Sequence, residues 1–438
     1  MQQFGLGLAG MGNVGAGVYK HLTQNRALLR ERLGYEMVVR KIAVRDPQRA
    51  RSIAAPADLL TSRWEDLLDD PAIQIVVELM GQKEKSLRLI LGAIERHKIV
   101  VTGNKALLAE HGKEIFAAAA AHQVPVFFEA AVGGGIPIIK AIREAFVGNH
   151  LQSIHGIVNG TSNYILTRMT DAGLGFGDAL REAQDAGYAE ADPALDVNGG
   201  DAAHKAIILA SLAYGFWIPP EKVFVEGIEH LTAGDICFAR RLGYRIKLLA
   251  IIKADHFTPA APGGEIEVRV HPTLIPEKHV LASVNGVFNA MAVKGDVVGE
   301  TLFYGRGAGQ DATASAVISD LAEAADALQS PRRNLGFMPH GLYGTCKPIG
   351  DIVSEYYLRL TVEDRPGVIA QIASILGELN IGISSILQPE SDEEGTSVAL
   401  VLMIHRATNA QMTDALTRIT ALACVTKAPR MIRVEHFG

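Results

Sequence analysis

Short apolar runs alternate with amphipathic stretches over the first third of the chain. The apolar runs lie at residues 4–9, 37–44, 73–79, 99–102 and 124–128. Between most of them, apolar residues recur at helical spacing, as at 85–96 and 105–122. Strands that alternate with helices are typical of a parallel sheet covered by helices on both faces. We therefore predict an α/β domain over residues 1–147.

The pattern becomes mixed after a candidate helix at residues 136–146. A strand is indicated at 151–158, and helices at 164–170, 176–186 and 202–213. Strand-like runs follow at 247–253, 265–271, 287–293 and 298–304. This mixture predicts an α+β domain over residues 148–308. We expect the alanine-rich helix at about 309–328 to complete the N-terminal domain.

The last part of the chain has its own order of strands and helices. Residues 329–351 are rich in Gly and Pro and lack periodicity, so we predict a linker or surface loop at 329–354. Beyond it, strands are indicated at 356–362, 383–388, 398–404 and 431–434, and helices at 366–379 and 409–422. This βαββαβ order predicts a ferredoxin-like unit over residues 355–438.

Composition limits what the chain can do. Its 438 residues provide for two or three domains, and 48% hydrophobic residues with 44 glycines suit an α/β enzyme. A formal charge of −6 without a basic stripe argues against a nucleic-acid partner. Cys237, Cys346 and Cys424 have no metal-ligand spacing and are interpreted as reduced thiols. The N-terminal segment lacks the basic region of a signal peptide, and the apolar stretch at 207–218 is too short to span a bilayer. We expect a cytoplasmic protein with no membrane partner.

A glycine motif follows the first predicted strand. Gly10, Gly12 and Gly15, with Asn13 and Val14 before the last glycine, form GxGxxG at the start of a predicted helix. Glycines at these positions permit a tight turn and let a pyrophosphate approach the helix-terminal amides. In this strand–turn–helix context the motif predicts a dinucleotide site, whereas alone it indicates only a glycine turn.

The end of the second predicted strand bears on the choice between NAD and NADP. Arg45 stands where an acidic residue would favour the free ribose hydroxyls of NAD. Its guanidinium is able to pair with the 2′-phosphate of NADP. Because Asp46 follows directly, we favour NADP and leave NAD open.

Residues 187–205 pack carboxylates into a short loop that ends in a helix. The carboxylates belong to Glu190, Asp192, Asp196 and Asp201, and the helix carries Lys205. Asp201 and Lys205 stand four apart, so they share one helix face. Carboxylates around a lysine let it hold and return a proton, and they are also able to bind a substrate ammonium. The alternative is a solvated acidic loop that caps the helix through Asp201.

Four further segments lie where ligands often bind. Lys105 follows the predicted strand at 99–102, where it is able to approach both nicotinamide and substrate, although an exposed helix-start lysine is the alternative. Glu129 precedes a run of small residues whose carbonyl groups suit a hard cation, but this run also fits a plain glycine-rich turn. Thr161 or Ser162 can cap a helix whose amides would meet a carboxylate. The glycine-rich run that ends at Gly309 precedes a helix and could close over the cofactor. The 14 histidines form no recognisable constellation, and none is assigned a role.

Taken together, the motifs resemble those of homoserine dehydrogenase. In chain order they are GxGxxG, TGNKA, EAAVGGGIP, NGTSNYIL, GYAEADPALDVNGGDAAHK and GRGAGQDATASAV, and they extend over residues 1 to about 330. The stretch LTVEDRPGVIAQIASILGELNIGI is similar to an ACT domain, a small amino-acid-sensing module. The resemblance is to the monofunctional form of the enzyme, which has no aspartate-kinase domain.

The resemblance implies NAD(P)H-dependent, reversible reduction of L-aspartate 4-semialdehyde to L-homoserine, in threonine, methionine and isoleucine biosynthesis. By motif position, Lys205 would give a proton to the developing alkoxide, and Lys105 would assist near the aldehyde. Glu190 would bind the substrate, with Asp196 and Asp201 shaping the same pocket.

Other site residues carry over from the family in the same way. Gly160 and Thr161 would add to the substrate site, and Gly309 would join Lys105 at the cofactor. The ACT-like tail implies an amino-acid effector, most simply threonine, and a homodimer or homotetramer.

The family's sodium site corresponds to Glu129 and the carbonyl groups of Val132, Gly134 and Ile136. One departure from the family is the glycine in EAAVGGG, where some members carry alanine. This change leaves a carbonyl-based site intact, so a sodium ion is expected as a possible ligand.

Two other functions share parts of this pattern. Aspartate-semialdehyde dehydrogenase has the same cofactor fold and metabolite, but it needs a nucleophilic cysteine. None of the three cysteines lies in a helix-start or basic context that would activate it. A ligand-sensing regulator would use the nucleotide fold and the tail, but it would have no reason to keep Lys105 and Lys205 beside the acidic loop.

Overall fold

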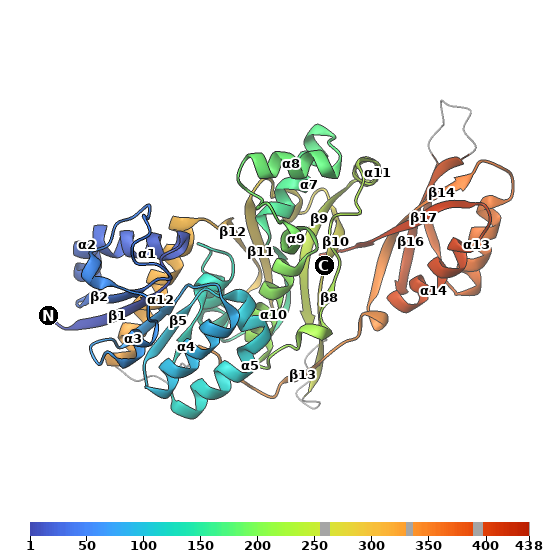
Figure 1. Cartoon of the computed structure of the whole chain (residues 1–438). Coiled ribbons are helices and arrows are strands. Elements are labelled where there is room, and N and C mark those ends of the chain that lie inside the picture. The colour runs from blue at the N-terminus through green and yellow to red at the C-terminus, as the bar shows by residue number, and fades with distance from the viewer. Residues whose placement is uncertain (255–262, 330–335, 389–396, 438) are drawn as a thin grey trace.

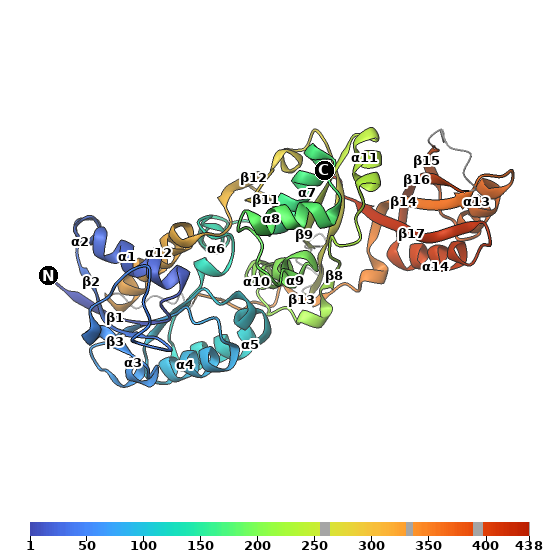
Figure 2. The same cartoon turned by 45° about the horizontal axis from the view of Figure 1, so that its top comes forward.

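The computed structural model describes residues 1–254, 263–329, 336–388 and 397–437. Figure 1 shows three units in a row, from the N-terminal unit in blue to the C-terminal unit in red. The same row is seen when the molecule is tilted (Figure 2). The C-terminal end of the chain returns to the central unit (Figure 1).

The N-terminal unit is built on a parallel sheet with strand order β3-β2-β1-β4-β5-β6. Its strands are β1 (Gln3–Ala9), β2 (Glu36–Ala43), β3 (Leu60–Thr61), β4 (Ile75–Glu78), β5 (Ile99–Thr102) and β6 (Val126–Phe127). Its helices are α1 (Asn13–Gln24), α2 (Arg26–Leu33), α3 (Glu65–Asp69), α4 (Lys83–Glu95) and α5 (Lys105–His122). The predicted α/β fold is confirmed, and the strand order is that of the doubly wound nucleotide-binding folds.

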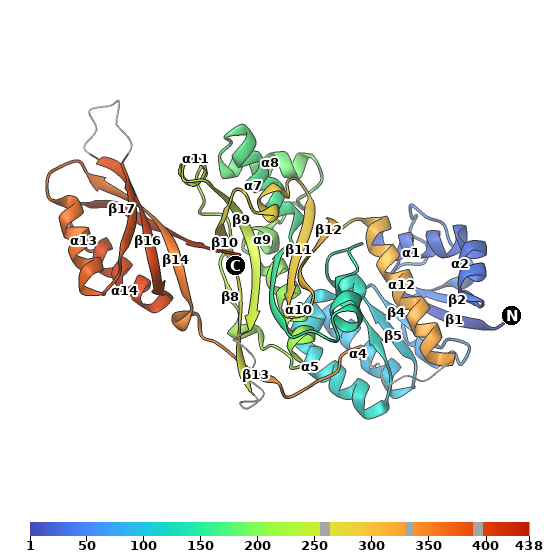
Figure 3. The same ribbon diagram turned by 180° about the vertical axis from the view of Figure 1, so that it is seen from behind.

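A helix from much later in the chain packs on this unit. α12 (Gln310–Gln329) runs beside α1, as Figure 3 shows, and its Val317 is buried in the same hydrophobic cluster as Val18. At the start of α12, Gln310 Nε2 donates a hydrogen bond to the Asn13 carbonyl at 3.0 Å. The chain therefore leaves the N-terminal unit, forms the central one and returns.

The central unit is an antiparallel sheet with strand order β12-β11-β7-β9-β10, and helices pack on it. Its strands are β7 (Leu151–Ile157), β8 (Phe224–Val225), β9 (Tyr244–Ala254), β10 (Gly264–Pro276), β11 (Phe288–Gly295) and β12 (Gly299–Arg306). Its helices are α6 (Ile138–Lys140), α7 (Gly160–Ala172), α8 (Phe176–Asp185), α9 (Ala194–Val197), α10 (Gly200–Tyr214) and α11 (Ala233–Arg241). The helix predicted at 136–146 is α6 followed by a π-helical turn, Ala141–Ala145.

The C-terminal unit has the predicted βαββαβ order, and its sheet order is β17-β14-β16-β15. Its elements are β14 (Val353–Glu363), α13 (Val368–Glu378), β15 (Ile383–Leu387), β16 (Ser397–Thr408), α14 (Asn409–Thr420) and β17 (Val425–Val434). β17 also pairs with β10 of the central unit, with Arg433 opposite Thr273 and Val434 opposite Leu274. The two sheets are therefore continuous, which the sequence did not indicate.

Buried charges hold the C-terminal unit to the central one. Glu435 is 3% exposed, and its carboxylate bonds Arg269 Nη2 at 2.9 Å and the Lys253 ammonium. Asp235 of α11 accepts from Arg359 Nε of β14 at 2.6 Å. Because these charges are withdrawn from water, each depends on its partner in the other unit.

The segment predicted as a linker contains a strand. β13 (Tyr343–Cys346) pairs in parallel with β10, so the prediction of a loop without regular structure is wrong at these residues. Part of the segment, 330–335, lies outside the described residues. The strand forms because β10 offers an open edge there, and a pairing of this kind does not depend on alternating side chains. Among the described helices, none combines the length and hydrophobicity that crossing a membrane requires.

Candidate active site

The glycine motif forms the tight turn that its spacing predicts. Gly10 has φ +104°, and a Cβ there would lie 2.5 Å from the Leu79 carbonyl oxygen. A Cβ on Gly15 would lie 2.2 Å from the carbonyl oxygen of Gly10, so neither position tolerates a side chain. Gly12, by contrast, faces open space at the start of α1. This leaves the first helix amides accessible to an anion.

A cavity of about 610 Å³ opens from this turn and extends past the end of β2. Arg45 lines it, and no hydrogen bond or ion pair engages the Arg45 guanidinium in the described part of the chain. Asp46 also lines the cavity, but its Oδ1 accepts from the Gln48 amide at 2.9 Å. The Arg51 guanidinium donates to the carbonyl groups of this loop, including that of Arg49 at 2.7 Å. Arg45 is therefore open to a ligand, and so is Arg49, which also lines the cavity and has no side-chain bond among the described residues.

A second cavity, of about 390 Å³, lies between the start of α5 and the acidic loop. It shares Leu79 with the first cavity. The four carboxylates of the predicted acidic loop and one predicted lysine line it: Glu190, Asp192, Asp196, Asp201 and Lys105. Residues far apart in the sequence thus meet at one cavity, as the resemblance implied.

Asp201 lies between the two lysines. Its Oδ2 accepts from Lys205 Nζ at 2.7 Å, and its Oδ1 lies 3.2 Å from Lys105 Nζ. Lys205 Nζ also donates to the Val158 carbonyl at 2.6 Å, which leaves one of its three N–H groups. Burial disfavours the charged form of Asp201, but Lys205 and Lys105 outweigh it and hold the pKa of this carboxyl below its usual value. The cluster therefore keeps a carboxylate and two ammonium groups together.

The two lysines differ in accessibility. Lys105 is 41% exposed in its side chain and lines the cavity, whereas the Lys205 side chain is 10% exposed and lies behind Asp201. Glu190 is exposed at the cavity, and among the described residues no hydrogen bond occupies its carboxylate. Its charge is free to meet a ligand ammonium.

The start of α7 supports the acidic loop from behind. The Thr161 hydroxyl donates to the Tyr188 carbonyl at 2.8 Å. Gly160 packs so closely that a Cβ would lie 2.8 Å from the Val287 carbonyl oxygen. Thr161 thus lies beside the acidic loop and Gly160 beside Val287, and neither lines the smaller cavity. Their amides are the first of the helix, where intrahelical partners are missing.

Sequence reasoning missed two residues at this site. Asn159 caps α7, and its amide group also bonds Asp196 and Asp201. The prediction that Thr161 or Ser162 caps this helix is therefore wrong, because both lie inside α7. No local signal indicates the bonds from Asn159 to the carboxylates. His204 lines the smaller cavity, and burial lowers its pKa. Its place directly before Lys205 was the available signal.

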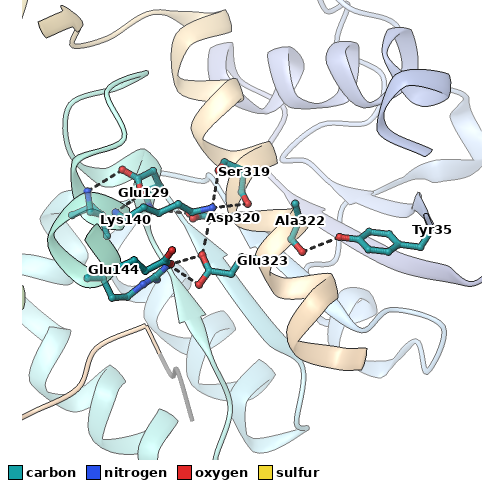
Figure 4. A network of polar contacts seen from close by, with 10 residues as sticks. Tyr35, Glu129, Lys140, Glu144, Ser319, Asp320, Ala322 and Glu323 are labelled. Atoms are coloured by element: carbon teal, nitrogen blue, oxygen red, sulfur yellow. Dashed lines mark hydrogen bonds and ion pairs between the residues drawn. The ribbon is translucent and has the colours of Figure 1, made fainter. Parts of the chain in front are cut away.

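The predicted sodium segment carries a carboxylate that is already bonded. Glu129 accepts from the Ile139 amide at 3.0 Å and from the Lys140 amide at 2.8 Å, and so caps α6. Its own amide donates to Asp320 Oδ2 of α12 at 2.8 Å (Figure 4). A cation here would depend on carbonyl oxygens, and that of Ile136 already accepts from the Ile138 amide at 2.8 Å. In the described chain, no group of three His, Cys, Asp or Glu side chains forms a metal site.

Models of known families match most of the chain. A homoserine dehydrogenase model matches residues 137–322, a homoserine dehydrogenase NAD-binding domain model matches 10–129, and an ACT domain model matches 356–423. A homoserine dehydrogenase of Pseudomonas aeruginosa is 44% identical over 443 residues that cover 100% of both chains. One of Bacillus subtilis is 36% identical over 438 residues, again 100% of both. The chain belongs to the homoserine dehydrogenase family.

Solved structures of homoserine dehydrogenases have the same fold. The enzyme from Thiobacillus denitrificans matches with a TM-score of 0.93 and 44% identity, over 100% of this chain and 99% of that one. A hyperthermophilic archaeal homoserine dehydrogenase mutant in complex with NADPH matches with a TM-score of 0.60 and 26% identity, over 74% of this chain and 98% of that one. As a homoserine dehydrogenase, the chain is an NAD(P)-dependent oxidoreductase with Rossmann-type, catalytic and ACT domains, and the aspartate-semialdehyde dehydrogenase alternative is excluded.

Proposed function

We propose that the chain catalyses the reversible reduction of L-aspartate 4-semialdehyde to L-homoserine, with NADP favoured over NAD. The observation that carries this proposal is the Lys205–Asp201–Lys105 cluster beside the smaller cavity, which adjoins the dinucleotide cavity at Leu79. A site for a charged amino acid thus lies next to the site for a nicotinamide cofactor.

The amino-acid part of the substrate is proposed to bind by its charges. Glu190 lines the cavity, and its carboxylate has no hydrogen-bond partner among the described residues, so it would pair with the α-ammonium. Asp196 would contribute to the same pocket. The amides of Gly160 and Thr161 at the start of α7 would receive the carboxylate. In this arrangement the aldehyde end of the substrate would lie near Lys105 and Lys205.

Proton transfer is assigned to Lys205. Its Nζ has one N–H left after the bonds to Val158 and Asp201. During reduction, this ammonium would donate a proton to the alkoxide oxygen, and in the reverse direction its amine would accept one. Lys105, nearer the opening, would place a second positive charge beside the developing oxyanion.

The residues present fit a dinucleotide. Gly10, Gly12, Asn13, Val14 and Gly15 form the turn and helix start that would hold the pyrophosphate. When bound, NADPH supplies the hydride. Arg45 would pair with its 2′-phosphate, and Lys105 and Gly309 would contact its nicotinamide half. The sodium ion remains a prediction, and no step depends on it.

Replacement of Lys205 by Ala tests this assignment. We expect kcat to fall by a factor on the order of 10² or more, while NADP still binds. Turnover is followed at the nicotinamide absorbance band with homoserine and NADP, and cofactor binding by fluorescence. Lys113→Ala, an exposed lysine on α5, serves as the control and should retain wild-type kcat. Near-normal turnover of Lys205→Ala would remove Lys205 from the mechanism, and a wild-type enzyme inactive on homoserine would contradict the function itself.

We also propose that the ACT domain binds threonine as a feedback inhibitor of this biosynthetic pathway, in a homodimer or homotetramer. The loop at 364–367 supports this proposal, because Asp364 is exposed and Gly367 begins α13 with φ +88°. The test uses the full-length enzyme, since removal of the domain would take away Glu435 and Arg359, the ion-pair partners of the buried Arg269 and Asp235. Millimolar threonine should inhibit the wild type, and Asp364→Ala should require more of it. Indifference of the wild type to threonine and the other amino acids of the pathway would contradict the sensing role.

A further inference from the structure

Asn159 occupies the junction between β7 and α7, beneath the acidic loop. Its side chain is 5% exposed, and Oδ1 accepts a hydrogen bond from the Ser162 amide at 2.8 Å. This bond fixes the orientation of the amide group, because only the oxygen end is able to accept from an N–H. The NH₂ end must therefore face the opposite direction, toward the cavity wall.

Both N–H groups of that NH₂ end are used by carboxylates. Asn159 Nδ2 donates to Asp196 Oδ1 at 2.7 Å and to Asp201 Oδ2 at 2.8 Å. In the part of the chain that the structure describes, the bond from Asn159 is the one that orients the Asp196 carboxylate. The same Asp201 oxygen also accepts from Lys205 Nζ at 2.7 Å. One neutral side chain thus sets the orientation of both carboxylates.

The neutrality of this donor matters for the site. Two carboxylates that face one point repel each other, and a shared donor reduces that repulsion. A lysine or arginine would do so as well, but it would compete with the substrate ammonium for the same oxygens. An amide supplies the two hydrogen bonds without adding a positive charge. The hydrogen bond that caps α7 also holds the Asn159 side chain in place, so that its amide group has little rotational freedom.

We infer that Asn159 is a positioning residue of the active site. It holds the Asp196 carboxylate toward the amino-acid pocket and the Asp201 carboxylate in contact with Lys205. It touches no reacting atom and acts through these two side chains. The inference rests on the proposed function, since it assumes that Asp196 and Asp201 serve homoserine and its proton transfer.

Asn159→Ser tests this role without removing the helix cap. Serine caps a helix as well as asparagine does, but its single O–H cannot make both of the bonds that Asn159 Nδ2 makes to Asp196 and Asp201. We expect the KM for homoserine to rise about tenfold or more, in line with the loss of a hydrogen bond to a charged group, while the KM for NADP changes less than about twofold. Asn163→Ser is the matched control, because Asn163 is also buried in α7 but bonds backbone carbonyl groups such as that of Val284. It should lower the melting temperature without changing the KM for homoserine.

A double-mutant cycle with Asp196→Ala separates positioning from general damage. If Asn159 affects homoserine binding through Asp196, the serine variant should add little to the KM of Asp196→Ala. The inference would be overturned if the KM of the double variant equalled the product of the two single effects. It would also be overturned if the KM of Asn159→Ser for homoserine equalled that of the wild type or of Asn163→Ser. The proposed function fails separately, if the wild type does not turn over homoserine or if Lys205→Ala turns over normally.

Discussion

The buried ion pairs between the ACT and catalytic domains should be a large source of stability, and Glu435 tests this most directly. Its carboxylate bonds Arg269 and Lys253 and lies 3.4 Å from His155 Nε2. Glu435→Gln keeps the shape of the side chain but removes its charge, while Arg269, which is 1% exposed, stays buried. Breaking a buried pair from one side costs about 3–5 kcal/mol, because the remaining charge has lost its compensation. The expected loss of unfolding free energy lies near the lower end of this range, because Glu267 still lies 3.5 Å from Arg269.

The dependence of this effect on pH follows from the pKa of Glu435. Burial opposes ionisation of this carboxyl, but His155, Lys253 and Arg269 outweigh it and hold its pKa far below the ordinary value. A carboxyl whose pKa is lower in the folded state contributes stability above its unfolded pKa of about 4.3 and loses it as the pH falls toward the folded pKa. The difference in free energy of unfolding between wild type and Glu435→Gln should therefore be constant from pH 6 to 8. It should become smaller as the pH falls below the unfolded pKa.

The assay is urea unfolding followed by circular dichroism, with the midpoint as the observable, because a chain of three domains need not unfold in two states. Glu378→Gln is the control, since the Glu378 side chain is 61% exposed and its pair with Arg418 should contribute only about 0–1 kcal/mol. In 1 M NaCl the urea midpoint of Glu378→Gln should equal that of the wild type. The midpoint of Glu435→Gln should stay below that of the wild type, because salt screens a buried pair much less. A Glu435→Gln midpoint equal to that of the control, or one restored by salt, would refute the reasoning.

Three other predictions concern the active site and one buried lysine. Glu190→Gln should raise the KM for homoserine and leave NADP affinity unchanged; a loss of dinucleotide affinity instead would place Glu190 elsewhere. Arg45→Ala should lower the ratio of kcat/KM for NADP to kcat/KM for NAD, because the Arg45 guanidinium lines the dinucleotide cavity and is able to pair with the 2′-phosphate; an unchanged ratio would mean that another residue, such as Arg49, binds the phosphate. Burial lowers the pKa of Lys247 to about 8, below the unfolded value of about 10.4, so the unfolded chain binds more protons between these values and stability rises with pH. The urea midpoint of the wild type should therefore rise relative to that of Lys247→Met between pH 7.5 and 9.5. A difference between the two midpoints that does not change with pH would contradict this.

The sequence by itself determined the elements and most of the chemistry. Hydrophobic periodicity depends on which face of a strand or helix is buried, and each such face is encoded locally, so most of the longer strands and helices were found. The elements that the sequence analysis missed are α2, α3, α9, α11, β3, β8 and β13, most of which are short. GxGxxG is local in part: Gly15 is required by the carbonyl of Gly10 in the same turn, whereas the contact that requires Gly10 is with Leu79, after β4. The four-residue spacing of Asp201 and Lys205 placed them on one helix face, and their bond follows from that spacing.

The tertiary structure alone decided how these pieces meet. The approach of Lys105 to Asp201 joins two domains, and the amide of Asn159 reaches two carboxylates of a loop that is distant in the sequence. The pairing of β17 with β10 and the strand inside the expected linker depend on which sheet edges are open. The carboxylate of Glu129, the predicted cation ligand, also accepts hydrogen bonds from the amides of α6, which its local sequence did not indicate. Contacts of this kind arise from register and packing between distant segments, and no local pattern of residue types encodes them.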